Sequence, residues 1–331
     1  MLLTYIIICE EVLENNTIIR QYKGNNMVTE MNDIAALVVN YNSWAQTEEC
    51  VDHLLDISDK LNVLIVDNCS TDTSVEELKQ RYLKNTRVHI LANPHNDGYA
   101  KGNNAGIQYV QEKLSGIRYI LILNPDIIVR NKKTILALKQ ALEENEGYAA
   151  ASCQIVLNNQ WTNNAAYMWR FPKKKHLWWA GTFVQRLLLK NTNNTYDSVQ
   201  VSNGIAEVDV VTGCFFMAKM DDLLNVGGFD DRTFLYYEET ILAKKFARIN
   251  KQEAILIGEY VCHEHQKKDA ELKDYRNRLF HRQCFHNSKK IYIEYYSDMH
   301  GIEMFLCKTL NAIDYGMKTL LYGLLGMCSK S

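Results

Sequence analysis

The segment RYILILNPDIIVR, residues 118–130, contains an apolar run that stops at Asn124, Pro125 and Asp126 and then resumes. Short runs of apolar, β-branched residues are typical of central strands in a parallel sheet. Pro125 has no N–H to donate, so strand pairing should end there and the backbone should turn. Ligand sites in such sheets lie just past the carboxyl ends of the strands. We therefore expect Asp126 to face a crevice, although a surface Asp in a turn fits the same residues.

Upstream of this segment, apolar strands alternate with amphipathic helices. The expected strands are residues 34–41, 61–67, 87–92 and 118–123, and the expected helices are 43–57, 74–84 and 98–114. The second helix begins with the capping-box spacing Ser74 to Glu77. Strands separated by helices in this way form right-handed βαβ units. The sequence therefore predicts an α/β fold built on one parallel sheet.

Composition limits the class of protein. The chain has 331 residues, 47% of them hydrophobic, which is enough for a large core. Its 37 basic and 39 acidic residues nearly cancel, which argues against a nucleic-acid partner. Nine cysteines with no CxxC pair indicate free thiols in a reducing compartment, so we expect a cytoplasmic protein. The apolar start, residues 1–9, is too short to cross a bilayer, and residues 1–33 are interpreted as an N-terminal extension.

Each expected strand is followed by a polar cluster at the same end of the sheet. The cluster after the third strand, NPHNDGYAKGNNAG (93–106), is rich in Gly and Asn, so its backbone N–H groups can approach a ligand closely. The helix N-terminus that follows favours anionic groups such as a diphosphate. Asp67 could accept hydrogen bonds from a ribose or base, or simply cap its own turn. The candidate nucleotide-binding residues of these clusters are Asn40, Asp67, Gly98, Lys101, Asn104 and Asn124.

Further candidates lie in the second half of the chain. We expect a strand over residues 208–219, interrupted by Gly213, and another over 253–258. Glu238 and Glu239 open an amphipathic helix, where carboxylates also simply favour the helix dipole. His263 and His265, two residues apart on an extended segment, would point to the same side. That spacing suits metal ligands but also fits a surface pair.

The motifs VVNYNS, VDNCSTD, NDGYAKGNNAG and LNPD, in this order, resemble the nucleotide-sugar half of glycosyltransferase family 2. These are inverting enzymes with the GT-A fold, a Rossmann-like, mostly parallel sheet flanked by helices. Rhamnosyltransferase-like members that build bacterial surface polysaccharides are the most similar. The resemblance covers a catalytic domain of residues 34–268, divided into a nucleotide-sugar half (34–130) and an acceptor half (131–268).

The resemblance implies roles for individual residues. Asp126 corresponds to the family's metal-binding aspartate, while Asn124 replaces the first carboxylate of that motif. His263, or alternatively His265, would complete a Mn²⁺ or Mg²⁺ site. The string GGFDDRTFLYYEE resembles the acceptor-side motif, in which one carboxylate is the catalytic base. By position that base is Glu239, with Glu238 as the second choice.

The same resemblance implies a donor such as dTDP-rhamnose or a UDP-hexose and a glycan or polyprenyl-linked acceptor. Two other classes remain open: a non-catalytic nucleotide- or sugar-binding module, and a sugar nucleotidyltransferase. The latter normally carries a Gly-rich loop with a basic residue after its first strand, and VVNYNSWAQ has neither.

The C-terminal region, residues 269–331, is expected to be helical. Its last helix, residues 302–327, is apolar on one face. That face could lie on the inner surface of the plasma membrane, contact a second copy in a homodimer, or pack on the catalytic domain.

Overall fold

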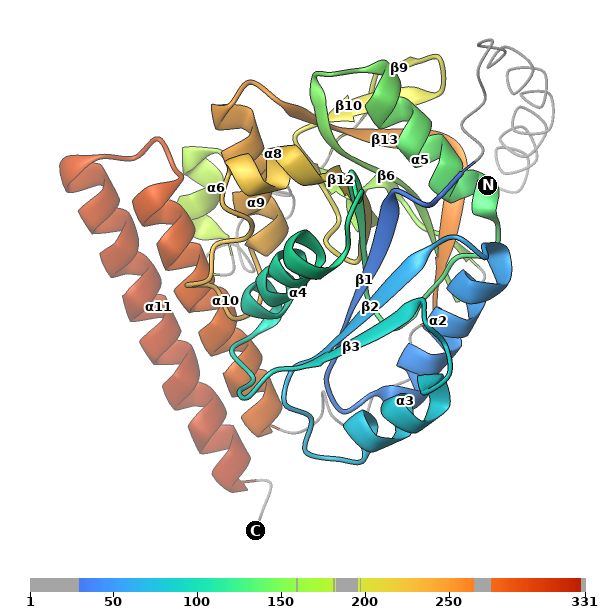
Figure 1. Ribbon diagram of the computed structural model, residues 1–331. Coiled ribbons are helices and arrows are strands. Elements are labelled where there is room, and N and C mark those ends of the chain that lie inside the picture. Colours follow the sequence, from blue (N-terminus) through green and yellow to red (C-terminus); the bar gives the residue numbers. More distant parts are fainter. Residues whose placement is uncertain are drawn as a thin grey trace, which may run out of the picture.

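The computed structural model describes residues 30–158, 160–180, 182, 196, 198–264 and 275–328. Within these residues the main sheet has eleven strands, nine of them in the order β3-β2-β1-β4-β12-β6-β13-β10-β9 (Figure 1). The chain therefore folds into helices around one large, mixed sheet, as the alternating pattern predicts.

The first half is parallel and follows the predicted alternation. Helices α2 and α3 cover one side of its strands and α4 the other (Figure 1). The register places Asn40 of β1 opposite Asp67 of β2, so both polar residues lie at the same edge of the sheet. The elements are β1 (Ile34–Asn40), α2 (Trp44–Ile57), β2 (Asn62–Asp67), α3 (Ser74–Tyr82), β3 (Val88–Ala92), α4 (Tyr99–Lys113) and β4 (Tyr119–Leu123).

The second half extends the sheet with both orientations. Strand β12 (Phe215–Lys219) runs antiparallel between β4 and β6 (Tyr148–Leu157), whereas β13 (Gln252–His263) is parallel to β6. Helix α5 (Lys132–Glu144) packs on β6 and β13. The remaining elements of this half are β5 (Ile127–Ile128), β7 (Gln160–Trp161), η2 (Asn164–Ala166), β8 (Met168–Trp169), α6 (Lys174–Trp179), β9 (Val201–Ser202), β10 (Ile205–Val208), β11 (Val210–Val211), α8 (Met220–Asn225) and α9 (Glu238–Arg248).

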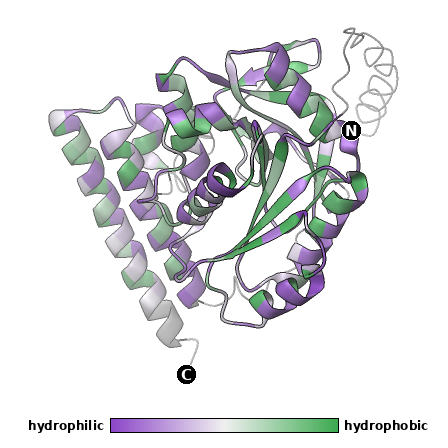
Figure 2. Cartoon of the chain, viewed as in Figure 1, coloured by the Kyte–Doolittle hydropathy of each residue, from purple (hydrophilic) through white to green (hydrophobic). Residues whose placement is uncertain are grey.

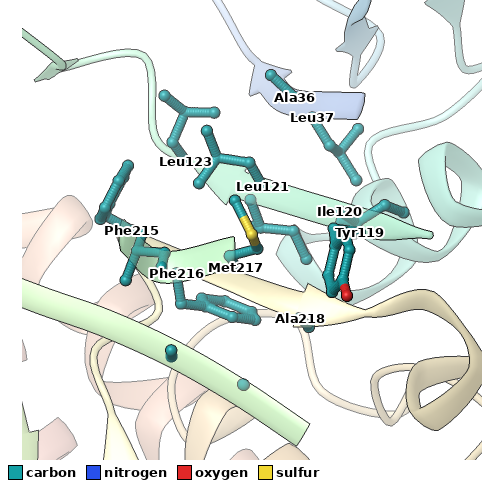
Figure 3. Packing of buried hydrophobic residues seen from close by; sticks show 14 of the residues in the cluster. Ala36, Leu37, Tyr119, Ile120, Leu121, Leu123, Phe215, Phe216, Met217 and Ala218 are labelled. Carbon is teal, nitrogen blue, oxygen red and sulfur yellow. The ribbon is translucent and has the colours of Figure 1, made fainter. Parts of the chain in front are cut away.

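The central strands are apolar because the core surrounds them. Every residue of β4 is buried, and in the register Leu121 lies opposite Met217 and Ile120 opposite Ala218 (Figure 3). The strands are largely hydrophobic and the outer faces of the flanking helices largely hydrophilic (Figure 2). At roughly 25 cal/mol per Å² of apolar surface, this burial is the main force that holds β4 at the centre.

Two long helices, α10 (Tyr275–Tyr295) and α11 (Gly301–Cys328), form the C-terminal region. They lie side by side at one edge of the molecule, with α11 outermost (Figure 1). Buried Tyr292 and Ile293 of α10 pack with Tyr237 and Ile241 in a second apolar cluster. No helix within the described residues is long and apolar enough to cross a membrane.

The predicted elements differ from the structure mainly in the second half. The strand expected over 208–219 is divided between β11 and β12, because Thr212, Gly213 and Cys214 form an irregular link between them. The strand expected over 253–258 extends from Gln252 to His263, with register irregularities that include the stretch between Leu256 and Tyr260. The N-terminal extension and His265 lie outside the described residues, apart from residues 30–33.

Candidate active site

Asn40 and Asp67 form a buried hydrogen-bonded pair at the ends of β1 and β2. Asn40 Nδ2 donates to Asp67 Oδ2 at 2.7 Å, and neither residue is exposed. Ser70 donates to Asp67 through both its backbone N–H (2.9 Å) and its hydroxyl (2.6 Å), while Thr47 donates to Asn40 Oδ1 at 2.7 Å. A buried carboxylate needs such donors. Asp67 therefore fixes the shape of the β2–α3 turn, and its predicted contact with a nucleotide stays a prediction.

The Gly- and Asn-rich segment joins the two halves of the molecule. Gly98 has a φ of +95°, and a Cβ there would lie 2.3 Å from the carbonyl oxygen of Phe234. Tyr99 N donates to the same oxygen at 2.9 Å. The Asn104 side chain exchanges two hydrogen bonds with the backbone of Phe229, at 2.8 and 3.0 Å. The close approach that Gly98 permits is thus to the chain's own backbone, and Lys101 is exposed near Asp97.

Asp126 and His263 meet because β5 pairs with the end of β13. The chain turns after β4, and the antiparallel register sets Ile127 opposite His263. Asp126 Oδ2 lies 3.1 Å from His263 Nε2, and both side chains are mostly buried. Burial disfavours the imidazolium, but hydrogen bonds with Asp126 and Cys214 outweigh it and raise the pKa of His263 to about 10. The structure therefore brings together two of the three predicted metal ligands.

A carboxylate oxygen and an imidazole nitrogen in contact become a donor set suited to Mn²⁺ once the cation displaces the imidazole proton. Within the described part of the chain, no group of three or more His, Cys, Asp and Glu side chains could hold a metal ion. Asp126 and His263 fit a cation that takes its other ligands from a bound molecule. The alternative ligand, His265, lies outside the described residues.

Glu238 and Glu239 begin helix α9, as predicted. Glu238 is 3% exposed, and its Oε1 has no hydrogen-bond partner among the described residues. Burial and the neighbouring Glu239 carboxylate raise the pKa of Glu238 to about 8. Burial also raises the pKa of Glu239, which is partly exposed. A carboxyl group with a raised pKa is a stronger base once ionised, so the pair is suited to proton abstraction.

The backbone just before this pair is constrained. Tyr236 and Tyr237 both adopt left-handed conformations, with φ of 75° and 68°, which is uncommon for aromatic residues. Helix α10 holds them: Tyr236 Oη lies 2.9 Å from His281 Nδ1, and the rings of Tyr237 and Tyr292 are 5.4 Å apart. Such conformations persist only where the surroundings impose them, often at functional sites.

Gly213 and Cys214 connect the carboxylate pair with the Asp126–His263 pair. A Cβ at Gly213 would lie 3.5 Å from Glu239 Oε2, so the absence of a side chain leaves room beside that carboxylate. The next residue, Cys214, hydrogen-bonds His263, and its carbonyl accepts from Asn124 N at 2.9 Å. Glu239, Asp126, His263 and Asn124 therefore lie around one short link between β11 and β12.

Two residues at this link were not predicted from the sequence. Tyr99 Oη donates to the Gly213 carbonyl at 2.7 Å, and Cys214 contacts His263. Tyr99 directly follows Gly98 in a segment already singled out, and Cys214 directly follows the glycine that interrupts an apolar run. Their positions next to these glycines were the available signal, but neither residue type indicates a role by itself.

Comparison with solved structures supports the GT-A fold. The mannosyltransferase PcManGT of Pyrobaculum calidifontis, solved with GDP-Man and Mn²⁺, is similar with a TM-score of 0.54 at 14% identity, over 99% of this chain and 89% of that one. GalNAc-T7, solved with UDP, GalNAc and Mn²⁺, also gives a TM-score of 0.54, at 12% identity over 71% of this chain and 43% of that one. The predicted GT-A fold, with helices following it at the C-terminus, is confirmed.

Sequence comparison identifies relatives among transferases. The low-salt glycan biosynthesis hexosyltransferase Agl10 of Haloferax volcanii is 25% identical over 294 residues, which are 88% of this chain and 83% of that protein. The rhamnosyltransferase WbbL of Escherichia coli K12 is 26% identical over 152 residues, 45% of this chain and 54% of its own length. The family model for glycosyl transferase family 2 matches residues 35–209, more than half of the chain, so the resemblance is confirmed and the protein belongs to glycosyl transferase family 2.

Proposed function

We propose that the protein is a metal-dependent, inverting glycosyltransferase that moves a sugar from a nucleotide-diphosphate donor to a glycan or polyprenyl-linked saccharide. The observation that carries this proposal is the link Gly213–Cys214, which has Glu239 on one side and the Asp126–His263 pair on the other. Glu239 could then act on the acceptor hydroxyl while a cation held by Asp126 and His263 acts on the donor diphosphate in the same displacement.

The nucleotide-sugar half would bind the donor. Of the candidate residues there, Asn40, Asp67 and Asn124 lie at the edge where β1, β2 and β4 end, and α/β sheets bind ligands at this edge. The relatives include a hexosyltransferase and a rhamnosyltransferase, so a UDP-hexose and dTDP-rhamnose are the proposed donors.

Glu239 would act as the base. It would take the proton from an acceptor hydroxyl while that oxygen forms a bond to the anomeric carbon and the nucleoside diphosphate leaves from the opposite face. Its position beside Gly213 favours it over Glu238, which is almost fully buried. The anomeric configuration would invert, because one displacement joins donor and acceptor.

Asp126 and His263 would hold a Mn²⁺ or Mg²⁺ ion, together with diphosphate oxygens. When bound, the ion supplies positive charge against the leaving diphosphate. The structure of PcManGT contains Mn²⁺ with GDP-Man, which makes Mn²⁺ the first cation to test. We also propose a cytoplasmic location, because nine cysteines without a CxxC pair indicate a reducing compartment. A homodimer stays a prediction.

The test is release of nucleoside diphosphate from UDP-, dTDP- and GDP-sugars, measured with and without Mn²⁺ for the wild type, Asp126→Ala and the surface variant Glu76→Gln. We expect turnover with one donor class, with Mn²⁺, in the wild type and Glu76→Gln but not in Asp126→Ala. Binding without turnover would identify the non-catalytic module instead. Pyrophosphate production from a sugar phosphate and a nucleoside triphosphate would identify the nucleotidyltransferase.

A further inference from the structure

Helix α11 turns an apolar face outward. We define the outer face of α11 by its large exposed side chains Ile302, Leu306, Ile313, Met317, Leu320 and Leu321, which are 42% to 72% exposed. Between residues 301 and 321 the exposed positions of the helix carry no charged side chain. At 1.5 Å per residue the face extends over roughly 30 Å. A water-facing helix normally has the opposite arrangement, so this face is expected to be covered.

The charged residues of α11 point elsewhere and are paired. Asp314 and Lys318 are buried and form an ion pair at 2.7 Å. Glu303 pairs with Lys174 at 2.6 Å, and Lys308 pairs with Glu294 of α10. The helix is thus fixed in this orientation by polar contacts on its inner side. Rotation about its own axis cannot hide the outer face without breaking them.

Positive charge borders the outer face. Lys290 and Phe305, both exposed, line a groove of about 360 Å³ between α10 and α11, and the guanidinium groups of Arg278 and Arg282 lie over the Tyr322 ring of α11. Residues 275–323 contain seven Lys and Arg but four Asp and Glu, whereas the whole chain has a net charge of −2. The two C-terminal helices are therefore the basic part of a slightly acidic protein.

We propose that the outer face of α11 binds the surface of a bilayer containing anionic lipids, with the helix lying in the interface and Lys290, Arg278 and Arg282 near lipid phosphates. An apolar face bordered by basic side chains is the pattern of interfacial helices. A two-fold dimer through the same face would bring two positively charged hairpins together, which is unfavourable. The described helices are not suited to crossing the membrane, so an interfacial position is the one that fits.

Helix α10 lies between the outer face of α11 and the Glu238–Glu239 pair and contacts the backbone next to that pair. Helix α10 contacts the turn before Glu238 through Tyr236–His281 and through Ser288 Oγ, which donates to Leu235 O at 2.9 Å. Bilayer binding would thus place the acceptor side near the lipid surface, where a polyprenyl-linked saccharide resides. The placement of the acceptor side rests on the proposed function, whereas membrane binding itself does not.

The experiment is co-sedimentation of the full chain with phosphatidylcholine vesicles, with and without phosphatidylglycerol. The variants are Ile313→Ser with Met317→Ser, Lys290→Glu, and Leu83→Ser as control, since Leu83 is 80% exposed at the end of α3. We expect the wild type and Leu83→Ser to bind the anionic vesicles, and the double variant to bind roughly tenfold or more weakly. Lys290→Glu should weaken binding to anionic vesicles by about fivefold or more.

Two further measurements are made without vesicles: light scattering gives the oligomeric state, and nucleoside diphosphate release gives donor turnover. The proposal is overturned if the wild type binds neither type of vesicle. It is also overturned if the wild type is a dimer and the double variant is a monomer. The double variant should keep wild-type turnover of free donor, which also shows that it is folded. Vesicle binding without any donor turnover would refute the proposed function and leave this inference standing.

Discussion

His263 Nε2 lies 3.1 Å from Asp126 Oδ2, although the two residues are far apart in the sequence. The contact exists because the two-residue strand β5 pairs with the last residues of β13. Backbone pairing, reinforced by the hydrogen bond from Glu264 N to Asp126 O at 2.9 Å, fixes the two side chains relative to each other. The metal site that we propose here would therefore need little backbone movement when a cation arrives, although the cation must displace the proton that His263 holds.

Replacing His263 by Ala should weaken Mn²⁺ binding in the presence of donor. Even residues that only orient a metal ligand change affinity by about 10- to 100-fold, so loss of a ligand should raise the half-saturating Mn²⁺ concentration by more than roughly 100-fold. Titration calorimetry with Mn²⁺ and the nucleoside diphosphate measures this directly. Glu264→Gln, the adjacent surface residue that pairs with Arg130, is the control and should titrate like the wild type. Equal Mn²⁺ affinity in His263→Ala and the control would show that His263 is not a metal ligand.

Glu238 should make the protein less stable as the pH rises. Its side chain titrates near 4.5 in the unfolded chain but near 8 in the fold, so between these values the folded state holds a proton that the unfolded state has lost. Stability from this group is therefore complete below about pH 4.5 and is lost as the pH rises through about 8. Glu238→Gln, which stays neutral, should be more stable than the wild type by about 3–5 kcal/mol near pH 9 and about equally stable near pH 4. Urea unfolding at the two pH values checks this, and a pH-independent difference would contradict the raised pKa.

Gly98→Ala should lower the free energy of unfolding more than Gly116→Ala does. The new Cβ would lie 2.3 Å from the Phe234 carbonyl oxygen, and the φ of +95° is itself unfavourable for Ala. Gly116 has a φ of +78° but nothing within 4 Å of the added atom, so Gly116→Ala isolates the backbone effect, about 1–2 kcal/mol. Gly98→Ala should cost several kcal/mol in denaturant titrations. If both variants lose equal stability, the close approach to Phe234 is not an obstacle.

The parallel half of the fold could be predicted from the sequence because three of its four strands are almost continuous apolar runs. In β1, β2 and β4 burial on both faces requires apolar residues at almost every position, and the intervening helices have the usual length. The position of Asp126 at a strand end followed from Pro125 in the same way. These features depend on local sequence, so no tertiary information was needed.

The mixed half could not be read in the same way. Strand β5 has two residues, and only its pairing with β13 explains why His263 reaches Asp126. The break at Gly213 was visible, but whether it was a kink or the end of a strand depended on contacts with Tyr99 and Glu239. The Gly- and Asn-rich pattern predicts that the backbone at Gly98 approaches a ligand, whereas in the structure it approaches the backbone of Phe234. Contacts between distant segments decided each of these cases.

Donor turnover by Glu239→Gln, compared with Glu238→Gln and the surface control Glu76→Gln, tests the central claim most directly. Loss of a general base costs typically 10²- to 10⁴-fold in rate. The measurement is nucleoside diphosphate release with Mn²⁺ and acceptor membranes, alongside calorimetric binding of the donor. We predict that Glu239→Gln binds donor like the wild type but turns it over about 100-fold or more slowly, whereas Glu238→Gln loses less and Glu76→Gln loses nothing. Wild-type turnover by Glu239→Gln would contradict the account.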